Sequence, residues 1–209
     1  MSEDTTSATA TPPAKKKRPF IDVRPVLDRL AQLHPQLFGA RFLPLKVGIF
    51  EDIMAAHPQA FTKEELKAAL GVHARSTRYL EAVASGAKRH DLAGAPVEDV
   101  APEHVHHALM EVFRRRQQRS KENLRPWAVT RLVRAIEASQ LSREDYLARV
   151  NAKDDESLGL LDEAFGEIGA RKAKREALRR AYEASGKSVE DFAEMYGLSA
   201  KDVRAAVSR

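Results

Sequence analysis

Apolar residues recur at every third or fourth position along most of this chain, a spacing that constrains it to amphipathic helices packed on one another. The first such segment runs from Val23 to a stop at Gly39. Its apolar face is formed by Val26, Leu27, Leu30, Leu33 and Leu37. With 209 residues and 43% hydrophobic composition, the chain can fill one well-packed core or two small ones. We therefore expect a mainly α-helical fold.

Capping residues and prolines indicate the next helices. A second helix is predicted from about Lys46 to a point before Pro58. Its buried positions would be Val47, Phe50, Ile53 and Met54. Thr62 and Glu65 have the spacing of a capping box at the start of a third helix, which we expect Gly71 to punctuate. The core-facing residues of this third helix would be Leu66, Ala69 and Leu70.

A short fourth helix from Ser76 to Val83 precedes a change of pattern. The turn-forming pair Ala93–Gly94 predicts a short hairpin, in which Pro96 makes one strand an edge or irregular element. A long helix is expected to begin at Pro102, since proline suits a first helical turn, and to run into Arg114–Arg116.

The last third of the chain contains an internal repeat. An Arg-Ala-Ile-Glu-Ala-Ser block precedes Ser142, and an Arg-Ala-Tyr-Glu-Ala-Ser block precedes Ser188 at the same spacing. Both serines are natural N-caps, and Tyr146 and Phe192 occupy matching positions at the start of a buried face. Each unit should form a helix, a tight turn and a second helix.

We divide the chain into four predicted regions. They are a disordered basic arm (1–21), a compact helical domain with a small β-hairpin (22–120), a basic linker (121–125) and an all-helical C-terminal module with two helix-turn-helix-like repeats (126–209). The arm is poor in apolar groups and carries Lys15–Arg18, so it cannot offset the entropy of ordering. A solubilising tail without a partner is the alternative for the arm.

Composition narrows the functional classes. The 35 Lys and Arg residues outnumber the 30 acidic residues, giving a formal net charge of +5, which suits a nucleic-acid partner only where the charge is concentrated. There are no cysteines, so disulfides and cysteine-based zinc sites are excluded and a reducing compartment, the cytoplasm, is expected. No apolar run is long enough to cross a bilayer, and we expect no membrane partner.

Three sequence blocks carry a family resemblance. They are Pro-Leu-Lys-x-Gly-Ile-Phe at Pro44–Phe50, Arg-Tyr-Leu at Arg78–Leu80 and Gly-Ala-x-Arg-x-Asp-Leu at Gly86–Leu92. Together with Glu103–Val105, which is similar to the start of the following helix, these blocks make residues 22–120 resemble the ProQ/FinO family of RNA-binding proteins. The resemblance implies a compact FinO-like helical domain whose concave basic face grips terminator-like hairpins and their 3′ tails.

The resemblance also implies a set of RNA-binding residues. Carried over by position, they are Lys46, Lys63, Lys67, Arg78, Tyr79 and Arg89. The sequence departs from the family pattern at Thr77, where Trp is common, and at Gly71, where a basic residue is found. Nearby residues that could compensate are Arg41, Arg75 and Lys88. The arginines can fork onto a phosphate, and Tyr79 can stack on an unpaired base or donate its hydroxyl to a ribose or phosphate oxygen.

Each residue has a plainer interpretation. The lysines could be ordinary solvated residues, Tyr79 could belong to the core and Arg89 could pair with Asp91. Arg114–Arg116 and the basic residues after them could form a solvated linker or a phosphate-gripping extension. His104, His106 and His107 lack a recognised ligand spacing, so we expect no metal site and regard the helix as exposed or partly basic.

We predict a cytoplasmic bacterial RNA chaperone that acts in post-transcriptional regulation through small RNAs and mRNA 3′ ends. No cofactor is expected and no enzyme is predicted, because phosphate-binding loops, nucleophile motifs and metal-ligand spacings are missing from the sequence. The alternative is a DNA-binding regulator that acts through the C-terminal helical hairpins. For that module we favour a protein contact or an accessory RNA surface.

Overall fold

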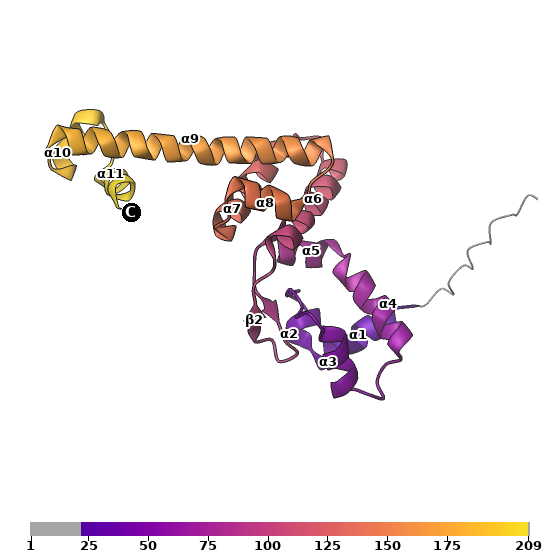
Figure 1. The fold of residues 1–209 in the computed structure, drawn as a ribbon. Helices are drawn as coiled ribbons and strands as arrows, with labels where there is room; N and C mark the ends of the chain where they lie inside the picture. Colours follow the sequence, from indigo (N-terminus) through magenta and orange to yellow (C-terminus); the bar gives the residue numbers. More distant parts are fainter. Residues whose placement is uncertain (1–21, 209) are drawn as a thin grey trace, which may run out of the picture.

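The computed structural model describes residues 22–208, a range that contains eleven helices and one two-stranded hairpin (Figure 1). This confirms the predicted fold class. The predicted basic arm, 1–21, lies outside the described residues. The N-terminal elements are α1 (Arg24–Leu33), α2 (Pro35–Phe38), α3 (Ile49–Ala56), α4 (Lys63–Ala74), α5 (Thr77–Ala84), β1 (Arg89–His90) and β2 (Pro96–Glu98). The later ones are α6 (Pro102–Arg119), α7 (Arg125–Ser139), α8 (Arg143–Val150), α9 (Asp155–Ser185), α10 (Val189–Tyr196) and α11 (Ala200–Val207).

The prediction of one helix up to Gly39 was wrong. His34 leaves the helical region, with φ −132° and ψ 66°, and splits the segment into α1 and α2. Pro35 explains the break, since proline disfavours the helical conformation in the residue before it. The apolar face survives the break, because Leu30 and Leu37 are both completely buried.

Two other boundaries differ from the prediction. Gly48 takes φ 86° and serves as the N-cap of α3, so this helix starts after Val47, which is 67% exposed rather than buried. Gly71 does not interrupt α4, which continues to Ala74. The reciprocal capping box of Thr62 and Glu65 is present as predicted.

The hairpin joins two of the family blocks. The β1 and β2 strands pair antiparallel with a register irregularity, as Pro96 led us to expect. The Asp91 carboxylate accepts hydrogen bonds from the amides of Ala93 and Ala95, which fixes the turn. On its other side, His90 exchanges backbone hydrogen bonds with Pro44 and Lys46. The first family block is therefore held directly against the third.

Helix α6 belongs to two cores at once. Its residues Val105, Ala108 and Val112 pack into the core formed by α1–α5. Its residues Leu109, Met110 and Phe113 pack instead with α7, α8 and the first part of α9. The predicted domain boundaries at residues 120 and 126 stay a prediction. Because α6 contributes to both cores, the N-terminal and C-terminal parts are packed directly against each other.

The internal repeat is retained in the backbone. Gln140 and Gly186 both take the left-handed conformation that ends a helix, and so do Asn151 and Gly197. Ser142 and Ser188 cap α8 and α10 as predicted. The second unit lies at the far end of α9, a helix of 31 residues and about 46 Å (Figure 1).

None of the helices described between residues 22 and 208 is both long and apolar enough to span a membrane.

Candidate nucleic-acid interface

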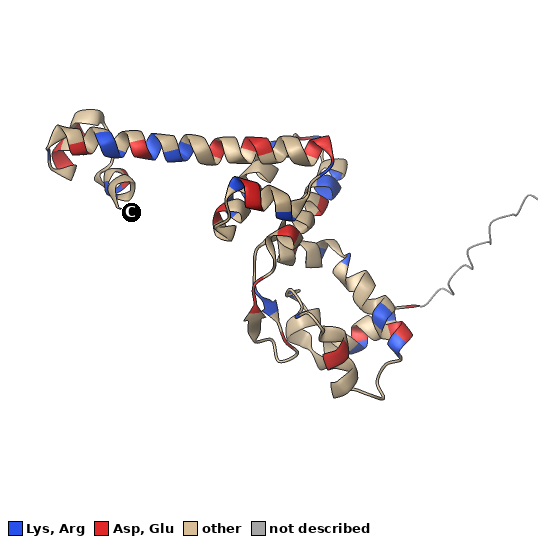
Figure 2. Ribbon diagram, viewed as in Figure 1, with Lys and Arg blue, Asp and Glu red and all other residues tan. Residues whose placement is uncertain are grey.

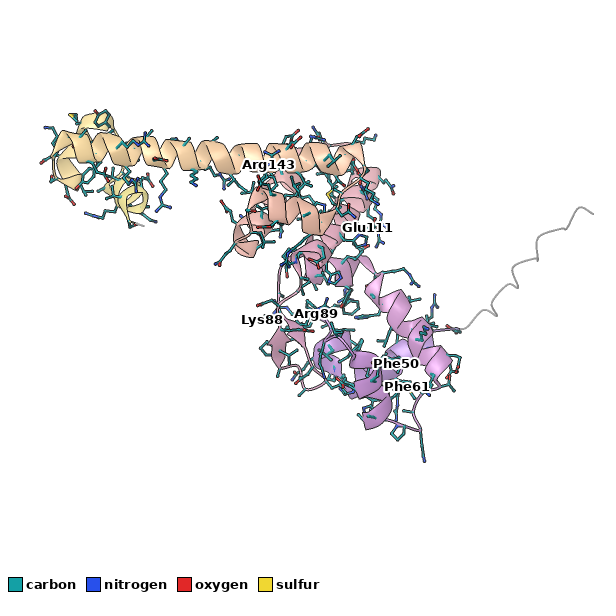
Figure 3. The ribbon with its side chains drawn as sticks, in the orientation of Figure 1. Phe50, Phe61, Lys88, Arg89, Glu111 and Arg143 are labelled. Atoms are coloured by element: carbon teal, nitrogen blue, oxygen red, sulfur yellow. The ribbon has the colours of Figure 1, made fainter. Side chains whose placement is uncertain are left out.

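A hollow of about 450 Å³ lies between α5, α6 and the start of β1. We call it the α5–α6 hollow. Its polar lining comes from Arg75, Tyr79, Arg89, His104, His107, Glu111 and Arg115. Three arginines and one glutamate in one depression give it an excess of positive charge. Figure 3 labels Arg89, the first residue of the hairpin, and Glu111 on α6.

Arg89 is the most firmly held of these side chains. Its Nη1 donates to the carbonyl oxygen of Leu45 at 2.9 Å, and its Nη2 lies 3.2 Å from Nδ1 of His104. Nε lies 3.8 Å from the carboxylate of Glu98, and the side chain is 15% exposed. Its partner is therefore Glu98 and not Asp91, whose carboxylate holds the hairpin turn. These contacts orient the guanidinium toward the hollow and hold it there.

Tyr79 lies at the wall of the hollow and is 8% exposed. Its hydroxyl oxygen accepts a hydrogen bond from the Leu45 amide at 3.1 Å. The ring packs in the N-terminal core, which leaves little surface for stacking on a base. No hydrogen-bond acceptor for the Tyr79 O–H is found among residues 22–208, so donation of that proton is the geometry open to this side chain.

Arg115 was missed as a site residue. From the sequence, Arg115 was predicted only as part of a run that forms either a solvated linker or a phosphate-gripping extension. Helix α6 places it in the hollow, where its Nη1 donates to the Arg75 carbonyl at 2.8 Å and to the Thr77 hydroxyl at 3.3 Å. Thr77 is the position where the family often has Trp. The small Thr77 side chain leaves room for an arginine from α6. This could have been predicted only if the pairing of α5 with α6 had been known.

Arg75 also depends on a departure from the family pattern. A Cβ on residue 71 would lie 3.3 Å from Nη1 of Arg75, so Gly71 gives this guanidinium slightly more space one helical turn later. The compensation by Arg75 stays a prediction. Arg75 is exposed and lines the hollow.

The other predicted residues lie outside this lining. Lys46 pairs with Asp52 at 2.7 Å, a hydrogen bond that raises the pKa of the ammonium group. Lys88 faces Asp99 at 3.5 Å. Exposed positions are held by Arg41, Lys63 and Lys67. The structure therefore brings together Arg75, Tyr79 and Arg89 in this hollow and leaves the remaining predicted residues outside it.

Arg78 stabilises the local structure next to the first family block. Its Nη2 donates to the Ala40 carbonyl at 2.5 Å, and its guanidinium lies 4.4 Å from the centre of the Phe42 ring. Beneath it, His73 is buried among Phe38, Phe42 and Tyr79. Burial, and secondarily the Arg78 charge, lowers the pKa of His73 to about 4. Arg78 thus holds the loop before the first family block against α5.

Most of the arginines predicted to form a solvated linker or a phosphate-gripping extension contact carboxylates of neighbouring elements. Arg114 contacts Asp154 and Glu156 at 2.7 and 3.1 Å, Arg116 contacts Glu81 at 2.6 Å, and Arg125 contacts Glu163 at 2.7 Å. These pairs hold α6 and α7 to their neighbours. Figure 2 shows the mixture of charges along these helices.

The histidines of α6 differ from one another. His104 and His107 are exposed at the hollow, but His106 is 5% exposed and packs against Tyr146. The prediction of an exposed or partly basic helix is therefore wrong at His106, where burial lowers the pKa to about 4. Among residues 22–208, no group of three or more His, Asp or Glu side chains is arranged to hold a metal ion.

The chain is similar to one protein family and to two solved structures. The model of the ProQ/FINO family matches residues 20–125. A FinO-like RNA chaperone from Neisseria meningitidis MC58 is 34% identical over 41% of this chain and 88% of its own, with a TM-score of 0.38. A ProQ homolog from Legionella pneumophila is 27% identical over 56% of this chain and 99% of its own, with a TM-score of 0.39.

Proposed function

Since this chain belongs to the ProQ/FinO family, we propose that it is an RNA chaperone that binds structured RNAs through a terminator-like hairpin and its 3′ tail. The observation that carries the proposal is the α5–α6 hollow, in which Arg75, Arg89 and Arg115 converge from α4, β1 and α6. Convergent arginines fork onto phosphate oxygens, and a depression of this size suits the end of a strand.

Within this proposal the hollow takes the 3′ tail. Arg89 and Arg75 contact its phosphates, and Tyr79 donates its hydroxyl proton to a ribose or phosphate oxygen. Arg115 keeps the carbonyl of Arg75 and the Thr77 hydroxyl in place. Glu111, at the same wall, can accept a hydrogen bond from a ribose hydroxyl.

The duplex part of the RNA contacts the exposed cations around the hollow. Lys63 and Lys67 are one helical turn apart on α4, so their ammonium groups can follow phosphates of an A-form helix that proteins recognise mostly by shape. Lys46, Arg41 and Lys88 add phosphate attraction at other edges, and Arg78 acts by positioning its loop. These contacts position the RNA and do not read its sequence.

The biological role that follows is post-transcriptional regulation in the cytoplasm, through small RNAs and mRNA 3′ ends. Binding at the tail shields a 3′ end, and a held hairpin can be presented to a complementary strand. No reaction is assigned to the site.

The test is equilibrium binding of the full chain to a terminator-like hairpin with a 3′ tail, measured by fluorescence anisotropy across a salt series. We expect affinity to fall steeply with salt, because neutralised phosphates release counterions. Removing the tail should weaken binding in the wild type and have little further effect in Arg89→Ala. A flat salt profile, or equal binding of tailed and tailless hairpins, would contradict the proposal.

We do not propose DNA binding through α10 and α11. Exposed acidic residues lie on α10, namely Glu190, Asp191 and Glu194, and Arg204 of α11 is paired with Glu190. This charge arrangement does not suit a pair of helices that approaches phosphates.

A further inference from the structure

A second hollow, of about 350 Å³, lies between the end of α5, the chain that leads into α6, and α7. We call it the α7 hollow. Its floor is apolar and includes Ala84, Val100 and Val105. Its cations are Arg131 and Arg134, both from α7 and both outside the region matched by the family model.

These two arginines differ from the arginines of the α6 run. The residues Arg114, Arg115, Arg116 and Arg125 each contact a carboxylate. Within the described range 22–208, no carboxylate lies within ion-pair distance of Arg131 or Arg134. Both are exposed, and a spacing of three places them on one face of α7.

Arg131 is oriented by an aromatic contact. Its guanidinium lies 5.7 Å from the centre of the Trp127 ring, and Arg116 lies 4.9 Å from the same ring. Stacking of this kind leaves the N–H groups of a guanidinium available to an anion. Arg131 is therefore placed beside Trp127 while it lines the α7 hollow.

The remaining polar groups of the hollow are already engaged. The Ser85 and Ser139 hydroxyls donate to the carbonyls of Ala82 and Ile136. Asp99, the acidic residue in the lining, faces Lys88 at 3.5 Å. The unsatisfied donors that face this hollow are thus those of two guanidinium groups, which is the donor set that binds phosphate oxygens bidentately.

The two hollows are close neighbours. Val83 and His104 line the α5–α6 hollow, and the next residues in sequence, Ala84 and Val105, line the α7 hollow. Consecutive Cα atoms are about 3.8 Å apart, so the linings of the two hollows meet along both α5 and α6. The backbone of one RNA duplex can therefore reach both from the edge of this pair.

We propose that the α7 hollow is a second RNA-binding site, in which Arg131 and Arg134 bind backbone phosphates of the duplex whose 3′ tail occupies the α5–α6 hollow. The proposal rests on the proposed function, since it needs RNA at the first hollow. It extends the interface beyond the family domain onto α7.

The test compares two charge-reversal variants of the full chain. Arg131→Glu/Arg134→Glu removes the site, and Arg149→Glu/Lys153→Glu applies the same change of charge to exposed residues at the end of α8 and in the loop that follows. Binding is measured for the tailed hairpin and for the single-stranded tail alone, across a salt series. Arg134→Glu by itself provides a variant in which the stacking on Trp127 is untouched.

We expect Arg131→Glu/Arg134→Glu to weaken hairpin binding about tenfold and to flatten the log–log salt slope by roughly 1.5, with tail binding unchanged. The control pair should change hairpin affinity by less than about twofold. An equal loss of hairpin affinity in the two double variants would overturn the proposal. So would an unchanged hairpin affinity in Arg134→Glu combined with an unchanged salt slope in Arg131→Glu/Arg134→Glu.

The failures of the two proposals can be told apart. If Arg89→Ala loses tail binding and Arg131→Glu/Arg134→Glu binds like the wild type, the α7 site is wrong and the proposed function stands. If Arg89→Ala binds like the wild type and the α7 variant loses hairpin binding, the assignment of the tail to the first hollow is wrong. A wild-type chain that binds no hairpin overturns both.

Discussion

The Arg89 guanidinium donates a hydrogen bond from Nη1 to the carbonyl oxygen of Leu45, 2.9 Å away. This contact orients the guanidinium before RNA arrives, so less side-chain freedom is lost on binding.

We predict that Arg89→Lys weakens binding of the tailed hairpin although the charge is kept, because an ammonium group cannot bond Leu45 and fork onto a phosphate in one plane. A loss of about tenfold is expected, and a larger one for Arg89→Ala. Anisotropy titrations would measure both. Arg149→Lys, an exposed change on α8, is the matched control, and an Arg89→Lys variant that binds as tightly as this control would contradict the prediction.

Tyr79→Phe should destabilise the fold. The Leu45 amide would lose its acceptor in a buried setting, at a cost of about 1–3 kcal/mol in the free energy of unfolding. Thermal and urea denaturation would measure this cost. Tyr196→Phe removes a hydroxyl from a residue that is 56% exposed and should leave stability unchanged. Similar stability of the two variants would argue that the Leu45–Tyr79 bond contributes nothing.

Stability should decline as the solution becomes acidic. His73 and His106 have pKa values of about 4 in the fold, below the ordinary value of 6.5, so the unfolded chain binds protons that the native chain does not. The contribution of their neutral forms is complete above pH 6.5 and is lost progressively as the pH falls toward 4. Each histidine should cost about 2 kcal/mol between about pH 7 and pH 5.

Melting temperatures across this pH range would test the effect. His106→Leu should flatten the dependence, whereas the exposed change His107→Gln should not. A wild-type melting temperature that stays constant down to pH 5 would contradict the assignment.

Gln140→Gly should stabilise the protein. Gln140 holds φ 55° at the end of α7, and the matching residue of the second repeat is Gly186 with φ 60°. Glycine adopts this conformation without the steric cost of a Cβ, so a gain of about 0.5–1 kcal/mol is expected in chemical denaturation. Ala138→Gly, inside the same helix, is the control and should be destabilising; a loss of stability in both variants would argue against strain at Gln140.

Local sequence signals predicted much of this fold. The Thr62 capping box, the serine caps of the repeat and the Ala93–Gly94 turn depend on neighbouring residues alone, and the structure contains each of them. The break at His34 also has a local cause, because Pro35 disfavours the helical conformation in the residue before it. It was missed because the apolar pattern continues across the break.

The site was less accessible to such reasoning. Arg89 and Tyr79 came from the family resemblance, but Arg115 enters the hollow only because α6 packs on α5, and His106 is buried only because α8 covers it. Pairing between helices distant in sequence is not encoded in a local pattern. The same reason explains why Arg131 and Arg134 were passed over and the engaged arginines of α6 were noticed.

The assignment of the RNA tail to the α5–α6 hollow can be tested by NMR titration of the full chain with a tailed hairpin, followed by residue-specific chemical-shift changes. We predict the largest changes, dependent on the tail, at Arg75, Tyr79, Arg89, His104 and His107. Tail-dependent changes confined to α10 and α11, with these five residues unaffected, would contradict it.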